Sequence, residues 1–366
     1  MHDRVLQINL GAIVENIRRV RAFTGKKILA CVKSNGYGMG AVQISRAIES
    51  CVDWFGVATI EEARCLRKSG IKKNILILGQ VLPCDVAYAR AHRISVTVGS
   101  MESLESLLSH CRYSRDTLGI HLKIDTGMGR IGIMPDAART AVSRILAARH
   151  LRLEGIFTHL AEAENPDTSF SRQQVKVFNA VLKILPPQAR KFTHVANSAG
   201  VVNVPESWKD FSMVRIGLLL YGVYPTLFLR IFRNKPALKY ALTGKTTLVL
   251  ARDMQKGATI GYGRTYACEK DMRIGVAAIG YGDGLNRHLS NKFFMKYNGR
   301  LFRIRGNICM DQTMLEIPGF ISPGDTLTFL DEQLSAEDMA ELCNTTVHEI
   351  LCNFGATRLT KEYHGL

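Results

Sequence analysis

With 366 residues, 46% apolar residues, 22% charged residues and only 10 prolines, the chain is long enough for two domains and excludes a disordered, collagenous or low-complexity protein. Its formal net charge is +16, and most of this surplus lies in residues 1–230. Such a surplus usually belongs to solvated helix faces. Because no aromatic residues are interleaved with the basic clusters, we expect no nucleic-acid partner.

The N-terminal segment and the cysteines bear on where the chain is expected to function. Residues 1–9 contain no basic stretch followed by an apolar run, and the longest apolar stretch, 216–232, is interrupted by Gly222 and Pro225. We therefore expect neither a signal peptide nor a membrane span. The nine cysteines are odd in number and form no CxxC pair, so we expect neither a disulfide framework nor a metal site, and a cytoplasmic location.

In the first two thirds of the chain, runs of Val, Ile and Leu alternate with helical patterns, which predicts a parallel sheet with crossover helices. The predicted strands are 28–32, 54–58, 75–78, 94–98, 120–124, 153–158, 192–196 and 213–216. The predicted helices between them include 43–50, 61–68, 103–109, 137–150 and 171–185. Eight such units in about 230 residues favour a (β/α)8 barrel of the TIM type, with a doubly wound open sheet as the alternative.

After Pro236 the pattern changes to strands separated by glycine turns, which predicts a mostly β C-terminal domain. The predicted strands are 241–250, 259–262, 274–279, 296–305, 314–317 and 326–329, and the predicted helices are 335–343 and 348–352. We place the domains at 1–232 and 233–366. The opening strand, about 4–9, could join either domain.

Polar residues follow several predicted strands, and in a barrel these strand ends meet at the C-terminal face. Lys33 enters a loop with three alternating glycines and is either a carbonyl-trapping amine or a snorkelling side chain. His121, Lys123 and Asp125 share one strand face, which suits either a ligand or a structural ion pair. His159 is either a proton relay or a satisfied core histidine.

The seventh and eighth strands end in 194–200 and 214–218. Barrels often bind a phosphate in the loops after these two strands, through backbone N–H groups at a short helix N-terminus. Ser198, Gly217 and Leu218 occupy those loops. A phosphate site opposite an emergent lysine points to a phosphorylated aldehyde cofactor, with pyridoxal 5′-phosphate (PLP) as the candidate.

Eight segments, in order along nearly the whole chain, resemble those of alanine racemase, a fold-type III PLP-dependent amino-acid racemase. They are VKSNGYG with Lys33, LKIDTGMGR with Lys123 and Arg130, FTH with His159, Asn197-Ser198, VRIG with Arg215, GYGRTY with Tyr262, GYGDG with Tyr281, and CMDQ with Met310. Each segment alone is a weak signal. The ordered set across both domains is a strong one.

The resemblance implies that Lys33 holds the cofactor covalently and is one of two catalytic bases, with Tyr262 as the other on the opposite cofactor face. A proton that leaves from one face and returns on the other inverts the α-carbon. His159 and Arg215 are implied to support Tyr262, and Arg215 is also implied to face the cofactor's pyridine nitrogen. Arg130 would contact the cofactor's phenolic oxygen, fixed by Lys123, which the family often carbamylates.

The resemblance also assigns the remaining contacts and the assembly. The further cofactor contacts are Tyr37, His159, Asn197, Ser198, Gly217, Leu218 and His348, and the substrate contacts are Arg130, Met310 and Tyr281. In the family, the residues matching Tyr262, Tyr281 and Met310 come from the partner subunit. A head-to-tail homodimer with two shared sites is therefore implied, which interconverts L-alanine and D-alanine to supply D-alanine for peptidoglycan.

Five residues depart from the family pattern: Met39 replaces a usual histidine, Asn307 an arginine, Thr346 an isoleucine, Val347 an asparagine and His348 a tyrosine. Asn307, Thr346 and His348 lie near the implied substrate entrance. A racemase for serine or lysine therefore stays open as an alternative. A non-catalytic PLP-binding barrel protein is disfavoured by the Tyr262 and CMDQ segments, and a decarboxylase by the absence of its Cys-Glu-Ser-Gly-Asp segment.

Overall fold

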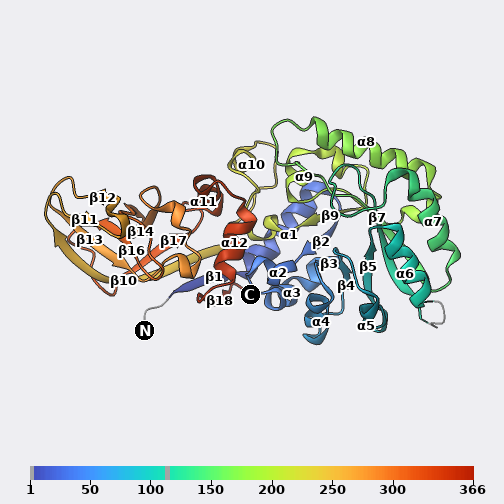
Figure 1. Cartoon of the computed structure of the whole chain (residues 1–366), viewed down its shortest axis with the longest axis horizontal. Coiled ribbons are helices and arrows are strands. Elements are labelled where there is room, and N and C mark those ends of the chain that lie inside the picture. Colours follow the sequence, from blue (N-terminus) through green and yellow to red (C-terminus); the bar gives the residue numbers. More distant parts are fainter. Residues whose placement is uncertain (1–3, 112–115) are drawn as a thin grey trace.

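Eight parallel strands in the first two thirds of the chain surround a common axis and are covered by helices on the outside, as Figure 1 shows for the computed structural model, which describes residues 4–111 and 116–366. The strands are β2 (Lys27–Cys31), β3 (Trp54–Val57), β4 (Asn74–Ile77), β5 (Ile94–Val98), β6 (Leu118–Lys123), β7 (Leu151–Phe157), β8 (Thr193–His194) and β9 (Met213–Ile216). Their order is β8-β7-β6-β5-β4-β3-β2-β9, all parallel.

The two outer strands of this order come together and nearly close the barrel. The backbone N–H of Ser212 donates to the carbonyl of Thr193 at 2.9 Å, and that of Arg215 donates to the carbonyl of Ala196 at 3.0 Å. These bonds confirm the predicted barrel over the open-sheet alternative. The interior is closely packed, because inward and outward residues of the central strands are all buried.

The helices that cover the barrel begin at recognisable caps. Asn9, Thr59 and Asn197 each accept a hydrogen bond from a first-turn N–H group with the side chain, as N-cap residues do. The helices are α1 (Leu10–Thr24), α2 (Lys33–Tyr37), α3 (Ala41–Ile48), α4 (Ile60–Lys68), α5 (Val86–Ala91), α6 (Met101–Cys111), α7 (Ala138–Ala147), α8 (Ser169–Ile184), α9 (Ser198–Asn203) and α10 (Leu227–Ile231).

The C-terminal part is a mostly antiparallel β domain, as predicted. Its elements are β1 (Val5–Asn9), β10 (Leu242–Met254), β11 (Thr259–Ile260), β12 (Tyr266–Ala267), β13 (Met272–Ala277), β14 (Phe294–Tyr297), β15 (Arg300–Arg303), β16 (Thr313–Ile317), β17 (Thr326–Leu330), β18 (Thr360–His364), α11 (Ala336–Cys343) and α12 (Val347–Gly355). The opening strand β1 lies in this sheet, antiparallel to β10 and parallel to β18.

Three sequence predictions are wrong in detail. The single strand predicted for 296–305 is the hairpin of β14 and β15, because Asn298 and Gly299 both have positive φ (47° and 80°) and turn the chain back. The strand predicted for 192–196 is shortened to β8. The helix predicted for 137–150 ends at Ala147, because Ala148 is extended.

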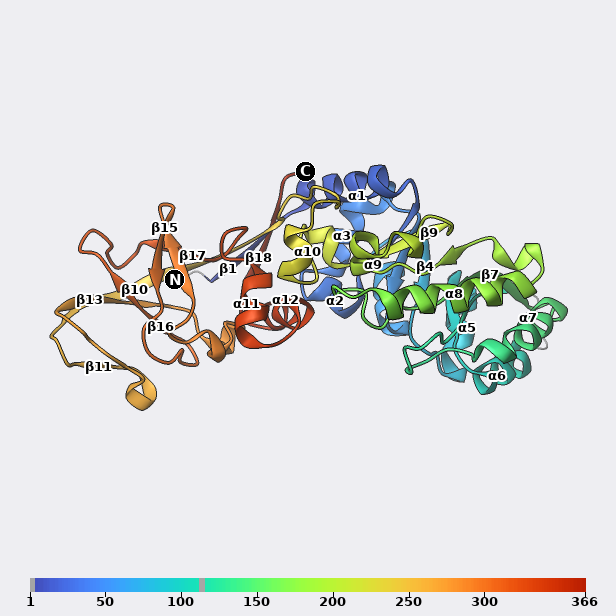
Figure 2. The same cartoon turned by 90° about the horizontal axis from the view of Figure 1, so that it is seen from above.

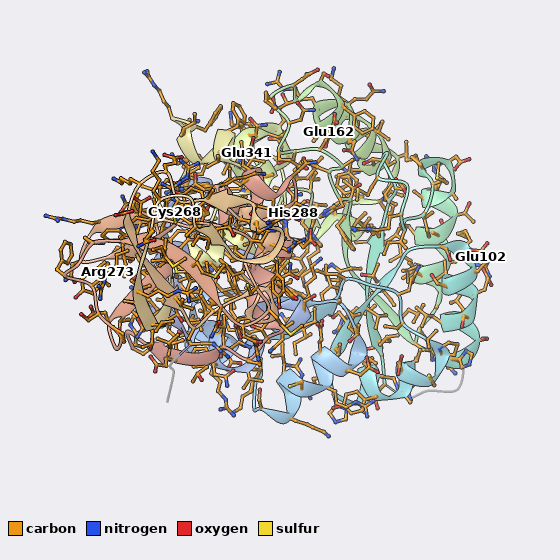
Figure 3. All side chains as sticks on the ribbon, turned by 60° about the vertical axis from the view of Figure 1, so that its left-hand side comes forward. Glu102, Glu162, Cys268, Arg273, His288 and Glu341 are labelled. Atoms are coloured by element: carbon orange, nitrogen blue, oxygen red, sulfur yellow. The ribbon has the colours of Figure 1, made fainter. Side chains whose placement is uncertain are left out.

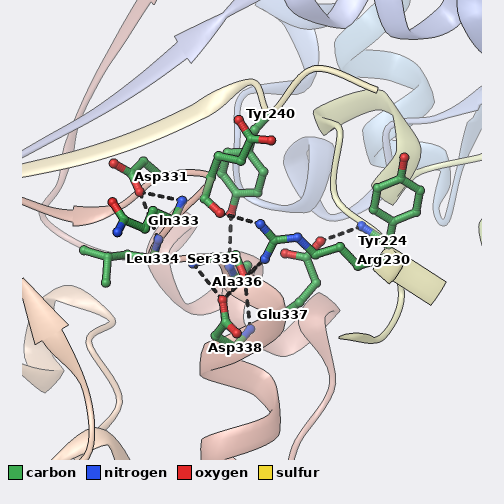
Figure 4. Close-up of polar contacts among 11 residues, drawn as sticks. Tyr224, Arg230, Tyr240, Asp331, Gln333, Leu334, Ser335, Ala336, Glu337 and Asp338 are labelled. Atoms are coloured by element: carbon green, nitrogen blue, oxygen red, sulfur yellow. Dashed lines mark hydrogen bonds and ion pairs between the residues drawn. The ribbon is translucent and has the colours of Figure 1, made fainter. Parts of the chain in front are cut away.

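The barrel and the β domain meet where α10 faces α11, and Figures 2 and 4 show this contact. The carboxylate of Glu337, only 2% exposed, accepts the backbone N–H of Tyr224 at 2.9 Å through Oε1. Arg230 donates to Ser335 at 2.5 Å, and the backbone N–H of Ala336 donates to the hydroxyl of Tyr240. The junction is therefore a polar cluster, in which Glu337 Oε2 has no hydrogen-bond partner among the described residues.

This cluster predicts a pH-dependent stability. Burial raises the pKa of Glu337 above the ordinary glutamate value, against the lowering effects of the Tyr224 N–H and Arg230. The native state therefore binds this proton more tightly than the unfolded state, and the stability it contributes falls as pH rises through the raised pKa. Glu337→Gln cannot titrate. We therefore expect its Tm, relative to that of wild type, to rise by about 2 °C when the pH is raised from 5 to 8.

The measurement is thermal unfolding at both pH values, with Glu341→Gln as the matched control. Glu341 lies on the same helix, α11, is exposed, and is labelled in Figure 3. The Tm of Glu341→Gln is expected to differ from that of wild type by the same amount at both pH values. A Tm difference between Glu337→Gln and wild type that shrinks with rising pH would contradict the prediction.

Candidate active site

A cavity of about 310 Å³ opens at the C-terminal ends of the barrel strands. Most of its wall consists of residues at the ends of the strands and in the loops that follow them, as expected for the active-site face of a barrel. One side is closed by α12 of the β domain. It is lined by Cys31, Lys33, Tyr37, Leu78, Lys123, Met128, Arg130, Phe157, His159, Leu160, Ala161, Glu164, Asn197, Ser198, Ala199, Arg215, Gly217, Pro225, Thr226, Thr345, Thr346 and His348.

Lys33 opens α2, which is a left-handed turn rather than an ordinary helix. Ser34, Asn35 and Tyr37 have φ values of 53°, 52° and 57°, and Gly36 between them has a φ of 66°. Left-handed backbone costs a non-glycine residue about 1–2 kcal/mol, so three such residues within one turn need external support. Both Lys33 and Tyr37, at the two ends of the turn, line the cavity.

Two side chains outside the turn support it. The carboxylate of Glu62 accepts the backbone N–H of Ser34 at 2.5 Å and that of Ala58 at 2.7 Å, so one side chain joins the loops after β2 and β3. The buried hydroxyl of Tyr221 donates to the carbonyl of Gly36 at 2.5 Å. Hydrogen bonds to a charged acceptor are the stronger kind, and Glu62 supplies two of them.

Arg215 lies at the end of β9, is 3% exposed, and donates hydrogen bonds from both of its Nη atoms. Its Nη2 donates to the carbonyls of Thr158 and Val195 at 2.9 Å each and to Nδ1 of His159 at 3.1 Å. Its Nη1 donates to the carbonyl and Nδ1 of His194 at 3.0 Å and 2.9 Å. His159 is thus a partner of Arg215, and because an arginine only donates, the His159 Nδ1 must be unprotonated.

The electrostatics keep these groups in single protonation states at neutral pH. Burial lowers the pKa of Arg215 to about 10, so the guanidinium stays charged. Burial, with the neighbouring Arg215 charge, holds the pKa of His159 well below its usual value. His159 is therefore a neutral imidazole whose Nε2 carries the proton, which fits a hydrogen-bond donor or relay better than a permanent cation.

Lys123 is 3% exposed at the end of β6, and burial followed by the charges of Arg130 and Arg215 lowers its pKa to about 7. Asp125 does not pair with it among the described residues. Instead its Oδ1 accepts the backbone N–H groups of the following loop, 127–129. The ion-pair alternative for this strand is therefore wrong. Arg130 is exposed at the cavity rim.

The other end of the cavity is suited to a phosphate. The hydroxyl of Ser198 accepts the backbone N–H of Gly217 at 3.1 Å, and Asn197 caps the short helix α9. A Cβ at Gly217 would lie 2.1 Å from the hydroxyl of Tyr37, so only glycine lets the tyrosine reach this point. The side chain of Leu218 is fully buried outside the cavity, which leaves only its backbone for a ligand.

His348 and Thr346 reach the cavity from α12 and its N-cap, and both are exposed at the rim. The imidazole of His348 lies 5.7 Å, centroid to centroid, from the ring of Tyr37. Met39, in contrast, is fully buried and takes no part in the cavity wall.

Three predicted site residues do not reach this cavity within one chain. Tyr262, Tyr281 and Met310 are 72%, 44% and 54% exposed on the β domain. Tyr262 lies between β11 and β12, at the end of the β domain remote from the barrel in Figure 1. Asn307 Nδ2 donates to the carbonyl of Tyr262 at 2.8 Å and holds this turn.

The residues that support the site from behind were not predicted from the sequence. Glu62 and Tyr221 support the lysine turn, and Phe157 stacks on His194 with ring centroids 4.7 Å apart. His121 lies deeper in the barrel and is fully buried. One signal in the sequence could have indicated His194. It lies two residues before the end of the predicted strand 192–196, and therefore on the same strand face as Ala196.

Fold and cavity together define a class: a barrel enzyme that presents a lysine, a charged buried arginine and a phosphate-type cradle to one cavity, with a β domain appended. The family model described as the alanine racemase N-terminal domain matches residues 8–225, and that of the alanine racemase C-terminal domain matches residues 241–363. These two matches cover most of the chain. The chain belongs to the alanine racemase family.

Individual relatives agree with this assignment. An alanine racemase from Desulforamulus reducens is 35% identical, covering 98% of each chain. The alanine racemase structure from E. faecalis superposes with a TM-score of 0.91 at 35% identity, over 99% of this chain and 98% of that one. A histidine racemase from Leuconostoc mesenteroides subsp. sake superposes with a TM-score of 0.87 at 25% identity, over 99% and 98%.

Within the described parts of the chain, none of the helices combines the length and the apolar character that crossing a membrane requires.

Proposed function

We propose that this protein interconverts L-alanine and D-alanine in a homodimer, with Lys33 of one subunit and Tyr262 of the partner subunit as the two bases. One observation carries the proposal. Lys33 lies in a complete cofactor-type cavity, whereas Tyr262 is 72% exposed on the other domain of the same chain. A base on the opposite cofactor face is then available only from a second chain, whose β domain would cover the cavity.

As a member of the alanine racemase family, the chain is a PLP-dependent isomerase, and its cavity fits that group. Lys33 provides the amine for covalent attachment. Tyr37, Ser198 and the backbone of Gly217 and Leu218 would hold the phosphate, with Asn197 and His348 beside it. When bound, PLP accepts the electron pair that loss of the substrate α-proton leaves behind.

Arg215 is proposed to meet the pyridine nitrogen. Its guanidinium keeps its proton near neutral pH, since its pKa is about 10, and therefore donates a hydrogen bond without transferring the proton. A neutral ring nitrogen withdraws electrons more weakly than a protonated one. We infer that Arg215 favours simple proton return to the α-carbon over side reactions such as transamination.

His159 and Lys123 complete the proposed proton chemistry. The neutral His159, with its Nε2–H free to donate, would stabilise Tyr262 of the partner subunit when that tyrosine loses its proton. The pKa of Lys123, about 7, leaves much of the amine neutral, and the neutral amine is the form that carbon dioxide carbamylates. A carbamate there would bind Arg130, which would in turn meet the cofactor and the substrate.

We place this enzyme in the cytoplasm, supplying D-alanine for peptidoglycan. All nine cysteines are free, and seven of them are buried or partly buried, as suits a reducing compartment. Met310 and Tyr281 of the partner subunit would contact the substrate carboxylate.

The deciding experiment measures D-alanine formed from L-alanine by purified protein supplied with PLP, by polarimetry or a D-amino-acid-specific assay. We expect interconversion toward an equal mixture of enantiomers. Absence of D-alanine, from protein that binds PLP, would overturn the proposal.

A second candidate is a broader amino-acid racemase, and the entrance favours testing it. Thr346 and His348 give the cavity rim polar side chains, and a histidine racemase shares the fold. Relative racemisation rates of alanine, serine, lysine and histidine would separate the candidates. Alanine is expected to be fastest, and a faster rate with a bulkier amino acid would favour the second candidate.

The two-base assignment predicts an asymmetric defect. Tyr262→Phe removes only the hydroxyl, so we expect proton abstraction from L-alanine to slow by about a hundredfold or more, and abstraction from D-alanine, by Lys33, far less. Exchange of the α-proton with deuterated solvent measures each direction separately. An equal loss in both directions would contradict the assigned roles.

The support that Glu62 gives to the Lys33–Tyr37 turn predicts that a substitution outside the cavity impairs cofactor binding and catalysis. Glu62→Gln keeps one acceptor oxygen but replaces the other with an NH2 group. This group would face the backbone N–H of either Ser34 or Ala58, so one of the two hydrogen bonds is lost. We expect PLP affinity and kcat each to fall roughly tenfold, since a hydrogen bond to a charged acceptor is worth about 1.5–3 kcal/mol. Glu61→Gln, exposed on the same turn of α4, is the control and should match wild type.

A further inference from the structure

Beneath the cavity, three side chains form a continuous hydrogen-bonded row inside the barrel. Arg215 Nη1 donates to His194 Nδ1 at 2.9 Å, and His194 Nε2 lies 3.0 Å from His121 Nδ1. The two imidazoles are fully buried. Arg215 belongs to the cavity wall, whereas neither histidine does.

The direction of each hydrogen bond in this row follows from the arginine. A guanidinium has no acceptor, so the Nδ1 of His194 must be unprotonated and its Nε2 must carry the proton. That proton faces His121 Nδ1, which must therefore be the acceptor. His121 then carries its own proton on Nε2, an atom that is buried without a hydrogen-bond partner among the described residues.

Both histidines are held in the neutral form that this pattern requires. Burial, followed by the charge of Arg215, lowers the pKa of His121 to about 3 and holds that of His194 well below its usual value. No other ionisable side chain reaches the pair among the described hydrogen bonds. The tautomer of His194 is therefore decided by its two neighbours and not by pH.

The surrounding residues are arranged to admit the imidazole of His121. Trp54 packs edge-on against it, with ring centroids 4.9 Å apart. A Cβ at Gly155 would lie 2.7 Å from its Nδ1 and Cε1, so a larger residue there would displace the acceptor atom. Its Nε2 is buried without a hydrogen-bond partner among the described residues, which costs about 1–3 kcal/mol. We expect the hydrogen bond at Nδ1 to offset this cost.

We propose that His121 is a positioning residue for Arg215: by accepting the Nε2–H of His194 it fixes the tautomer whose Nδ1 accepts from the guanidinium. Without this acceptor, His194 can carry its proton on Nδ1, and an N–H group would then face the guanidinium N–H groups. The guanidinium would turn away from the position in which it meets the cofactor. The inference deepens the proposed function and rests on its assignment of Arg215.

The test compares two substitutions. His121→Asn places its amide oxygen close to the position of the imidazole Nδ1 and keeps the acceptor. His121→Leu fills similar volume without one. The first readout is the nitrogen-15 NMR signal of the His194 ring in each full-length protein. We expect an unprotonated Nδ1 in wild type and His121→Asn, and a protonated or mixed Nδ1 in His121→Leu.

The second readout is the kinetics of the PLP-loaded enzyme. We expect His121→Leu to lower kcat by about tenfold or more with KM for alanine nearly unchanged, and His121→Asn to restore most of kcat. Equal kcat losses in both variants, or an unchanged His194 tautomer in His121→Leu, would overturn the proposal. If neither variant folds, a protonated His194 Nδ1 in wild type would overturn it alone. The NMR arm also decides the inference if the protein racemises no alanine.

Discussion

Protein with Lys33→Ala is expected to lose its visible cofactor absorbance and to racemise alanine about a thousandfold more slowly, or not at all. Lys33 begins the left-handed turn after β2, and it lines the cavity together with Tyr37. Covalent attachment and one of the two proton transfers both depend on that amine, so the two functions are lost together. Absorbance spectra and D-alanine formation measure them independently.

Lys27→Ala is the matched control, since Lys27 begins the same strand, β2, at the opposite end of the barrel. It should keep both the spectrum and the rate. A Lys33→Ala protein that stays yellow with a normal spectrum would remove Lys33 from its proposed role. Lys123 is the second lysine of the cavity, and Lys123→Ala should retain the spectrum because that lysine is not the proposed attachment point.

Mixing two inactive proteins is expected to restore activity if the sites are shared. In a heterodimer of Lys33→Ala and Tyr262→Phe, one site carries both defects and the other carries neither. Random exchange makes half of the dimers mixed, so about a quarter of wild-type activity should return. The measurement is D-alanine formation after subunit exchange in mild denaturant and its removal.

No recovery is expected when either variant is mixed with itself, which serves as the control. If Tyr262 served the cavity of its own chain, every site in the mixture would carry one defect, and activity would stay at the low level of the separate variants. That outcome would contradict the shared-site homodimer. It would also require a large movement of the β11–β12 end of the β domain toward the barrel (Figure 2).

Much of the fold could be predicted because local patterns reflect burial. The strands of the barrel are mostly apolar, since both faces are covered, and strand β5 was predicted with its observed bounds. The hairpin of β14 and β15 was missed because Leu301 and Phe302 continue an apolar run across the Asn298–Gly299 turn. The turn residues carried the information, and the apolar pattern did not.

The sequence by itself predicted the alternation of strands and helices that favours a barrel, the appended β domain, and the residues at the strand ends that line the cavity, among them Lys33 and Arg215. These follow from periodicity and from motifs a few residues long. Only the tertiary structure decided which distant groups act on them: Glu62 on the lysine turn, and His194 and His121 behind Arg215. Hydrogen bonds depend on distances of about 3 Å between atoms, and residues far apart in the chain reach such distances only once the barrel closes.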